Sequence, residues 1–278
     1  MNEQNIHIGE IKEKLGEEDK MEDTIDFKVK ERKSGEKMER LRTDIPGFDE
    51  LIEGGFPIGS VNVLAGIAGS AKSIWVENLA WNITNRGMKV LYINFEQPEW
   101  EIIEQGEQFG WDFSAMTEEG LLKFISVDAR DLWSDEQIRD IEKQIVEGNY
   151  QVVILDSISS VYESPISSDQ VLATSARYTP QAFMEARRAH MVYFLNRLKR
   201  LKVTVICTAQ KVEGKPGDTT DNLIEFKGDS LTLFNFVEVG DDITRTVRIK
   251  KMRKTNIDGL THPFEFTENG VVVKQKEV

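Results

Sequence analysis

Residues 66–73 read GIAGSAKS and directly follow the short apolar run Val61–Ala65. With Gly66, Lys72 and Ser73 in place, the stretch matches the phosphate-loop pattern G-x-x-x-x-G-K-[ST], except that Ala71 stands where the second glycine belongs. The pattern requires a strand before it and a helix after it, and the flanking residues predict both. The sequence therefore predicts a phosphate-binding loop between a strand and a helix.

Such a loop wraps phosphates with backbone N–H groups at the positive end of a helix dipole. Lys72 would reach the β- and γ-phosphates of a nucleotide, and the Ser73 hydroxyl would bind Mg²⁺. The alternative is an ordinary turn rich in glycine and serine, with a solvated lysine. The residues assigned to nucleotide binding are Gly66, Ile67, Ala68, Gly69, Ser70, Ala71, Lys72, Ser73 and Ile74.

Two carboxylates at the ends of other apolar runs extend this prediction. Asp156 ends the run VVILD, and in nucleotide hydrolases such an aspartate holds Mg²⁺ directly or through water. Glu96 follows the run YINF, where it would face the γ-phosphate and orient or deprotonate a water molecule. The alternative for Glu96 is a surface acid capping the helix expected from Pro98, since acids are favourable at helix starts. The neighbouring Gln97 can form hydrogen bonds but cannot act as a base.

Outward from the loop, strand-like and helix-like segments alternate. Strands are expected at Ser60–Ala65, Met88–Phe95, Leu121–Val127, Gln151–Leu155 and Val203–Thr208. Helices are expected at Ser73–Arg86, Pro98–Phe109, Ser134–Glu147 and Ala182–Leu201. This alternation predicts the α/β class, with a mainly parallel sheet covered by helices on both faces. The last expected strands, Leu231–Val239, Thr244–Met252 and Phe264–Val273, predict C-terminal antiparallel strands, the third of them broken by a turn at Asn269–Gly270.

Composition limits the class of protein. Among the 278 residues 40% are hydrophobic, enough for a sizeable core, and the single Cys207 excludes an internal disulfide framework. The formal charge of −13 disfavours strong non-specific nucleic-acid binding. There is no run of about 18 apolar residues, as a membrane span needs, and the N-terminus does not resemble a signal peptide, so we expect a cytoplasmic protein. Residues 1–40 are rich in charge and predict a flexible extension, followed by one domain over residues 41–278.

Several motifs together resemble KaiC-like ATPase domains of the RecA superfamily. The longest is TDIPGFDELIEGGFPIGSVNVLAG, residues 43–66, which immediately precedes and enters the loop. It is followed in order by YINFEQPE, FGWDF, VVILDSIS, VTVICTAQ, VRIKKMRKT and HPFEFTENGVVV, so that the resemblance covers nearly all of residues 41–273. The resemblance implies a RecA-like P-loop NTPase fold, ATP and Mg²⁺ as ligands, and ATP binding at the subunit interfaces of a ring, often a hexamer.

The resemblance also implies roles for individual residues. Glu96 matches the first of two strand-end glutamates that activate water, while Gln97 departs from the second. Lys251 and Arg253 match the charges of a K-M-R-G segment that reaches the γ-phosphate of the neighbouring subunit. Gln210 resembles the polar group that senses the γ-phosphate in RecA-type proteins.

The remaining segments carry weaker signals. The polar segments Tyr162–Pro180 and Lys211–Asp229 are expected to be connectors, although the first could also bind DNA or accept phosphate. The basic run between Arg197 and Lys202 predicts a solvated helix end. Three tryptophans are expected to be packing residues, and three histidines show no ligand spacing; they are Trp75, Trp81, Trp100, His7, His190 and His262.

Three functions remain open at this point. The favoured one is an ATPase or ATP-dependent switch that acts through protein partners, with phosphorylation of its own serine or threonine residues as a variant. A recombination accessory protein that binds single-stranded DNA is the second, and the net negative charge disfavours it. The third is a protein that binds nucleotide without turnover. The departures at Ala71 and Gln97 put the rate of hydrolysis in question more than the fold.

Overall fold

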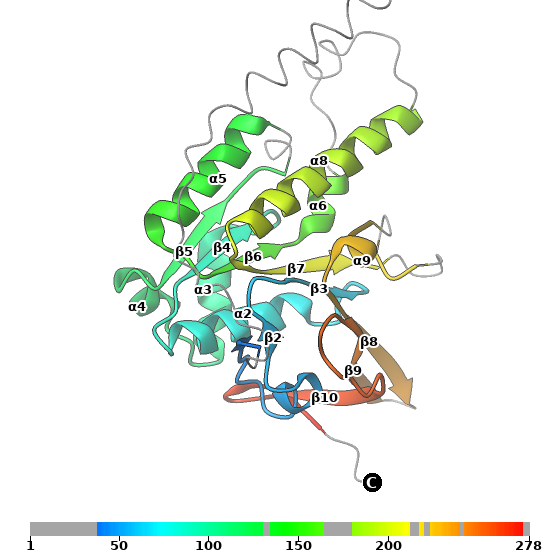
Figure 1. Ribbon diagram of the computed structural model, residues 1–278. Helices are drawn as coiled ribbons and strands as arrows, with labels where there is room; N and C mark the ends of the chain where they lie inside the picture. Colours follow the sequence, from blue (N-terminus) through cyan, green and yellow to red (C-terminus); the bar gives the residue numbers. More distant parts are fainter. Residues whose placement is uncertain are drawn as a thin grey trace, which may run out of the picture. The chain divides into compact units, whose positions relative to one another are not determined.

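A nine-stranded sheet in the order β11-β10-β9-β8-β3-β7-β6-β4-β5 organises the domain (Figure 1). The computed structural model describes residues 38–129, 134–163, 180–211, 217–219, 223–239 and 242–274. The six strands from β8 to β5 are parallel, and β9, β10 and β11 are antiparallel to their neighbours. The strands are β3 (Val61–Gly66), β4 (Val90–Asn94), β5 (Leu122–Ser126), β6 (Val152–Asp156), β7 (Thr204–Gln210), β8 (Ser230–Val239), β9 (Asp242–Met252), β10 (Thr261–Thr267) and β11 (Gly270–Val273). The predicted fold class is therefore confirmed.

Helices cover both faces of the sheet because strand side chains point alternately to opposite faces. Tyr92 and Ile154 pack on one face with Trp75, whereas Leu91 and Val153 pack on the other. The first face is covered by α2 (Lys72–Thr84), α3 (Glu99–Gln108) and α4 (Phe113–Glu118), and the second by α5 (Asp135–Gly148), α6 (Ile158–Glu163), α8 (Pro180–Arg200) and α9 (Leu223–Lys227) (Figure 1). The parallel strands β3, β7, β6 and β4 are thus buried on both sides, as their near-continuous apolar sequences require, whereas β5 at the edge of the sheet exposes Lys123.

The long helices begin and end where the sequence signals predict. Ser134 caps α5 by accepting a hydrogen bond from the Gln137 backbone N–H at 3.1 Å. At the other end Asn149 adopts φ 53°, the left-handed conformation that commonly ends a helix and that asparagine tolerates. The predicted turn at Asn269–Gly270 joins β10 to β11, with Gly270 at φ 113°.

The short elements differ from the sequence-based expectation. α4 was not predicted; it is six residues long, depends on the Asp112 side chain as its cap, and buries Phe113. The expected connector Lys211–Asp229 contains α9, and Tyr162 belongs to α6 and not to a loop. Helices this short are marginal by themselves and form through tertiary packing, so periodicity does not reveal them. A small two-stranded sheet, β1 (Arg40–Leu41) with β2 (Phe56–Pro57), and a 3₁₀ turn, η1 (Asp49–Ile52), were also not predicted.

Two further predictions concern parts of the chain that the structure covers incompletely. Residues 1–37 of the expected extension and residues 164–179 of the expected loop lie outside the described residues. Among the helices that the structure describes, none has the length and apolar character needed to cross a membrane.

Candidate nucleotide-binding site

The loop between β3 and α2 has a backbone that glycine makes possible. A Cβ on Gly66 would lie 2.3 Å from the Phe234 carbonyl oxygen, which no side chain tolerates. Gly69 adopts φ 75° and Ala71 adopts φ 73°, both in the left-handed region. No side chain caps the first turn of α2, and that turn contains no acidic residue. The backbone N–H groups of this first turn are therefore suited to donate hydrogen bonds to an anion.

Lys72 folds back over this loop. Its ammonium donates hydrogen bonds to the carbonyl oxygens of Gly66 and Ile67, each at 2.9 Å. Burial lowers the pKa of Lys72, while the nearby charges of Asp156 and Glu96 raise it. The lysine thus lies at the loop with neutral acceptors, within electrostatic range of both predicted carboxylates.

Asp156 lies at the end of β6, buried, with hydroxyl groups around its carboxylate. Tyr92 donates to Asp156 Oδ2 at 2.8 Å, Thr208 donates to Oδ1, and the Ser73 hydroxyl is a further hydrogen-bond partner. Burial raises the pKa of Asp156, against the effect of these hydrogen bonds. A carboxylate beside a serine hydroxyl offers the hard oxygen ligands that Mg²⁺ prefers, so the residues present fit the implied ion.

Glu96 lies beyond the end of β4 in a turn organised by Asn94. The Asn94 side-chain oxygen accepts hydrogen bonds from the backbone N–H groups of Glu96 and Gln97, at 3.1 and 3.3 Å. The Glu96 carboxylate accepts a hydrogen bond from the Ser160 hydroxyl. The N-cap of α3 is Pro98, and no side chain caps this helix. The alternative role of Glu96 as a helix cap is therefore not what the structure shows.

Gln210 lies beside the loop at the end of β7. It pairs with Gly66 across the β3–β7 ladder, and its backbone N–H donates to the Ser159 hydroxyl at 2.7 Å. Ser159 and Ser160 both belong to α6, so this one helical turn contacts Gln210 and Glu96 at once. Sequence reasoning missed both serines. The signal that could have found them is the serine-rich continuation of VVILD into DSISS, which places hydroxyl groups at the same edge of the sheet.

A buried acid in α2 was also missed. Glu77 is 0% exposed, and the Gln105 amide, with its nitrogen toward the carboxyl, donates to both oxygens at 3.0 and 3.1 Å. Burial, and secondarily the charge of Asp156, raise the pKa of Glu77 to about 8. Glu77 interrupts the apolar face of α2, which is the signal that the sequence carried.

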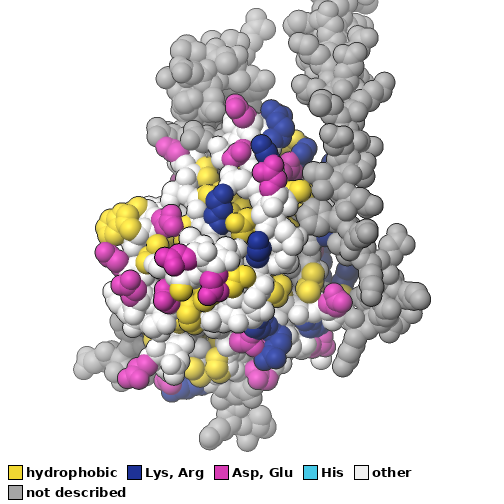
Figure 2. All heavy atoms as spheres, turned by 90° about the vertical axis from the view of Figure 1, so that its left-hand side faces the viewer, with side chains coloured by type: hydrophobic (Ala, Val, Ile, Leu, Met, Phe, Trp, Pro, Cys, Tyr) yellow, Lys and Arg dark blue, Asp and Glu magenta, His cyan; other side chains and the backbone are white. Residues whose placement is uncertain are grey.

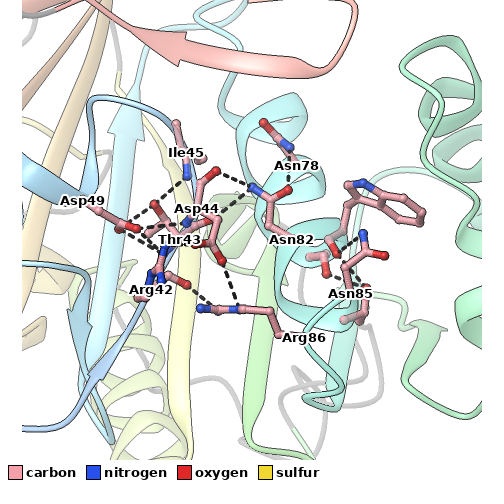
Figure 3. Close-up of polar contacts among 12 residues, drawn as sticks. Arg42, Thr43, Asp44, Ile45, Asp49, Asn78, Asn82, Asn85 and Arg86 are labelled. Atoms are coloured by element: carbon pink, nitrogen blue, oxygen red, sulfur yellow. Dashed lines mark hydrogen bonds and ion pairs between the residues drawn. The ribbon is translucent and has the colours of Figure 1, made fainter.

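Residues of the segment before β3 form hydrogen bonds and an ion pair with residues at the C-terminal end of α2 (Figure 3). The Asp49 carboxylate accepts hydrogen bonds from the Thr43 N–H at 2.9 Å, the Thr43 hydroxyl at 2.8 Å and the Asp44 N–H at 3.0 Å. Asn82 of α2 donates to the Thr43 and Asp44 carbonyl oxygens, and Arg86, just after the end of α2, forms an ion pair with Asp44 at 3.1 Å. The segment TDIPGFDE therefore fixes the helix on which the loop depends.

Lys251 and Arg253 lie at the end of the sheet where β3 begins, whereas the loop lies where β3 ends. Met252 pairs with Ser230, and Ser230 pairs with Asn62 at the beginning of β3. The four residue steps from Asn62 to Gly66 span about 13 Å at ~3.3 Å per residue. The strands therefore place both cations away from the loop of their own chain.

The two cations at the end of β9 have different partners. A register shift in the β8–β9 ladder and the end of β9 at Met252 place them differently. Lys251 donates to the carbonyl oxygens of Glu225 at 3.2 Å and Gly228 at 2.7 Å, whereas Arg253 forms an ion pair with Asp229 at 3.4 Å and its side chain is 55% exposed. Burial, and then the charge of Arg253, lower the pKa of Lys251. Arg253 is the cation that is open to solvent.

The prediction that Trp100 is a packing residue is wrong. Trp75 is buried at the centre of an aromatic cluster with Phe48, Phe234 and Phe264. Trp100, in the first turn of α3, is 57% exposed. Its position after Pro98, on the outer side of the helix, gives it no core to pack against.

Comparison with known proteins identifies relatives of the whole domain. The sequence model of the family described as "ATPase: KaiC" matches residues 41–278. The chain is 30% identical over 242 residues to the circadian clock protein KaiC3 of Synechocystis, a match that covers 85% of this chain and 46% of that protein. It is 26% identical over 256 residues to a UPF0273 protein of Pyrococcus furiosus, covering 86% of this chain and 95% of that protein.

A solved structure agrees with these matches. The crystal structure of a KaiC-like protein from Pyrococcus horikoshii superposes with a TM-score of 0.71 at 26% identity, and covers 86% of this chain and 100% of that one. The chain spans less than half the length of the KaiC relatives described as circadian clock proteins. It spans nearly the whole length of the UPF0273 relatives.

Proposed function

Because the chain belongs to the KaiC-like family of ATPases, we propose that it binds ATP with Mg²⁺ at the loop Gly66–Ser73 and hydrolyses ATP slowly. The observation that supports this most directly is that the side chains predicted to bind ATP and Mg²⁺ lie close together at the loop. Lys72 lies within electrostatic range of Asp156 and Glu96, and Ser73 is a hydrogen-bond partner of Asp156. Carboxyl ends of neighbouring parallel strands are where α/β sheets bind their ligands.

The loop would hold the triphosphate and the side chains would hold the ion. Lys72 would exchange the neutral carbonyl oxygens of Gly66 and Ile67 for phosphate oxygens, which accept stronger, charge-assisted hydrogen bonds. Ser73 and Asp156 would supply oxygen ligands to Mg²⁺, and the bound ion would supply positive charge that neutralises the phosphates. The uncapped N-terminus of α2 would add backbone N–H groups.

Glu96 is the residue that we assign to the attacking water. Its carboxylate would accept a proton from that water, and the Ser160 hydroxyl would hold the carboxylate in one orientation. Gln97 offers no second carboxylate, so we expect a slow reaction. Gln210, at the edge of the loop, would contact the γ-phosphate as a sensor.

The remaining part of the site would come from a second copy of the chain. Arg253 and Lys251 lie about 13 Å along the strands from the level of the loop, which supports a role in the neighbouring subunit of a ring such as a hexamer. Reaching a neighbouring phosphate would require Lys251 to leave the two carbonyl oxygens that it now contacts. Changes in this assembly with the state of the nucleotide would let the protein act as a switch toward a protein partner.

The alternatives have less support. Binding of single-stranded DNA needs a basic groove with aromatic platforms. On the face that Figure 2 shows, Lys and Arg side chains are scattered among Asp and Glu side chains, and they do not gather into one basic surface. Self-phosphorylation in residues 162–180 concerns a segment that mostly lies outside the described residues, and it stays a hypothesis.

Two variants with matched controls test the proposal. Lys72→Ala should weaken ATP binding in calorimetric titration, whereas Lys123→Ala, on the exposed side of β5, should not. Glu96→Gln should keep ATP affinity and lower turnover about 10²–10⁴-fold, whereas Glu99→Gln in the first turn of α3 should retain both. Absence of binding at millimolar ATP would exclude the proposed function. Binding without measurable turnover, in wild type and variants alike, would instead identify a nucleotide-binding protein that does not hydrolyse.

A further inference from the structure

One aspartate close to the proposed site is shared by two lysines. The Asp218 side chain is 11% exposed, and its two carboxylate oxygens contact different ammonium groups. Its Oδ1 lies 3.5 Å from Lys211 Nζ, and its Oδ2 accepts a hydrogen bond from Lys250 Nζ. Because a single lysine neutralises an aspartate, one of the two is free to serve another anion without leaving Asp218 unpaired.

The segment that carries Asp218 is held by α9. The Glu225 carboxylate accepts hydrogen bonds from the Asp218 backbone N–H at 2.6 Å and from the Thr219 backbone N–H at 2.7 Å. The Thr219 hydroxyl donates to the same oxygen of Glu225 at 3.2 Å. Three bonds to one carboxylate fix the backbone around Asp218, so its side chain keeps its place whichever lysine it binds.

Lys250 reaches Asp218 because of an irregularity in the sheet. Lys251 and Ile249 of β9 pair with two consecutive residues of β8, so Lys250 between them is the extra residue of a β-bulge. A bulge changes the direction in which a strand side chain points, and bulges are common next to active sites. The contact of Lys250 with Asp218 is the shorter of the two ion pairs. Lys250 therefore neutralises Asp218 independently of Lys211.

Lys211 lies next to the phosphate loop. Its backbone N–H donates to the Gly66 carbonyl oxygen at 2.9 Å, and the Lys72 ammonium donates to the same oxygen, also at 2.9 Å. These two nitrogen atoms are therefore separated by no more than twice this distance. The Lys211 side chain is 29% exposed and has a flexible four-carbon stem. Its ammonium can thus turn from Asp218 toward the loop while the backbone stays bonded to Gly66.

The proposed ATP site has much negative charge. Lys72 lies within electrostatic range of two carboxylates, Asp156 and Glu96, and the phosphates of ATP would add to this charge. Repulsion between like charges is strong in a partly buried site, so a further cation beside the phosphates would stabilise the complex in addition to Mg²⁺. Lys211 meets this need, because its backbone already contacts the loop.

We propose that Lys211 is a second phosphate-binding lysine, which leaves Asp218 to contact the γ-phosphate of ATP bound at the loop of its own chain. Lys250 stays on Asp218, so that this largely buried carboxylate is not left without a counter-ion, which would be costly. The contact requires the γ-phosphate, so Lys211 makes the site prefer ATP to ADP. This inference rests on the proposed ATP site and adds one residue to it.

Calorimetric titration of the full chain tests the contact, with ADP and with a non-hydrolysable ATP analogue, each in the presence of Mg²⁺. Lys211→Ala should lower the affinity for the ATP analogue about tenfold or more, because a charge-assisted hydrogen bond is lost. The affinity for ADP should change less than twofold, which also verifies that the variant is folded. Lys227→Ala is the matched control, because this lysine is exposed at the end of α9 and should leave both affinities unchanged.

Asp218 and Lys250 provide tests in opposite directions. Asp218→Asn removes the anion that competes for Lys211, so it should raise the affinity for the ATP analogue about two- to fivefold. The same substitution should give no gain in a Lys211→Ala background. Lys250→Gln leaves Asp218 to Lys211 and should lower the affinity for the ATP analogue by a similar factor. Asp218→Asn should remove this loss.

The outcomes separate this inference from the proposed function. Equal losses of ATP-analogue and ADP affinity in Lys211→Ala would show that Lys211 supports the loop structurally, and would overturn the inference. An unchanged affinity for the ATP analogue in Lys211→Ala, or a lower one in Asp218→Asn than in wild type, would also overturn it, and the ATP site itself would stand. A wild type that binds neither nucleotide would overturn both.

Discussion

Ala71 in the predicted phosphate loop has a backbone conformation that is unfavourable for every residue except glycine. At φ 73° and ψ 25° it is in the left-handed region, immediately before the first residue of α2. An L-residue pays roughly 1–2 kcal/mol there because its Cβ approaches the following carbonyl oxygen. Ala71→Gly removes this penalty but gives the unfolded chain more freedom, which costs about 0.4–1 kcal/mol.

The net expectation is a free energy of unfolding about 0.5–1 kcal/mol higher in Ala71→Gly than in wild type. For a domain of this size that corresponds to a rise in melting temperature of about 1–4 °C. Urea unfolding of the ATP-free protein measures the first quantity, and differential scanning calorimetry measures the second. The affinity for ATP should change less than twofold, because we expect the strain at this position to be the same with and without nucleotide.

Two glycines provide matched controls for this reasoning. Gly69 at φ 75° and Gly87 at φ 76° have no atom within 4 Å of an added Cβ, so alanine at either position introduces backbone strain without a clash. Gly69→Ala and Gly87→Ala should each lower the free energy of unfolding, which is the reverse of the effect of Ala71→Gly. A less stable Ala71→Gly protein would refute the strain argument. A more than tenfold gain in ATP affinity would show instead that the Ala71 side chain obstructs the phosphates.

Three other substitutions test parts of the site. Burial raises the pKa of Glu77 from its ordinary value of 4.5 to about 8, so between these pH values the folded state binds more protons than the unfolded state and the free energy of unfolding falls as the pH rises. Glu77→Gln should flatten the dependence of the melting temperature on pH and raise that temperature at pH 8. Ser160→Ala should lower turnover about tenfold, without changing ATP affinity, because only the orientation of Glu96 is lost; an equal loss in a Glu96→Gln background would show that Ser160 acts elsewhere. Asp49→Ala should lower the free energy of unfolding by about 2–3 kcal/mol in urea unfolding, because two partly buried N–H groups and the Thr43 hydroxyl lose their acceptor. A change below about 0.5 kcal/mol would contradict the role of this turn.

The fold was predictable because its strands are long apolar runs separated by helices with clear start and stop signals. Ser134 and Gly87, for example, mark helix ends that the structure shows close to the expected positions. The short helices were not predictable, because α6 and α9 form only where the neighbouring strands already provide a surface. Their positions depend on contacts between residues far apart in the sequence, which periodicity does not report.

The same distinction divides the residues of the site. Lys72, Asp156 and Glu96 could be found from the sequence because each follows an apolar strand, and parallel strands bring their carboxyl ends to one edge. Ser160 and Glu77 could not be found in this way. Ser160 contacts Glu96, which is 64 residues away in the sequence, and Glu77 contacts Gln105 of α3. Only the packing of helices α6 and α3 reveals these two contacts.

The two glycine positions at which this chain departs from the family pattern follow one physical rule. Ala71 replaces the glycine before the loop lysine, and Lys254 replaces the glycine after the cationic segment; they adopt φ 73° and φ 61°. Both positions therefore keep the left-handed backbone that glycine would supply, and both carry a strain of about 1–2 kcal/mol each. Strain of this kind persists only where surrounding contacts determine the conformation. Such contacts are present: Lys72 bonds to the loop carbonyls, and Arg40 donates to the Lys254 carbonyl oxygen at 3.3 Å. The pattern at these two sites therefore encodes a backbone conformation, which the chain preserves after losing the residue that favours it.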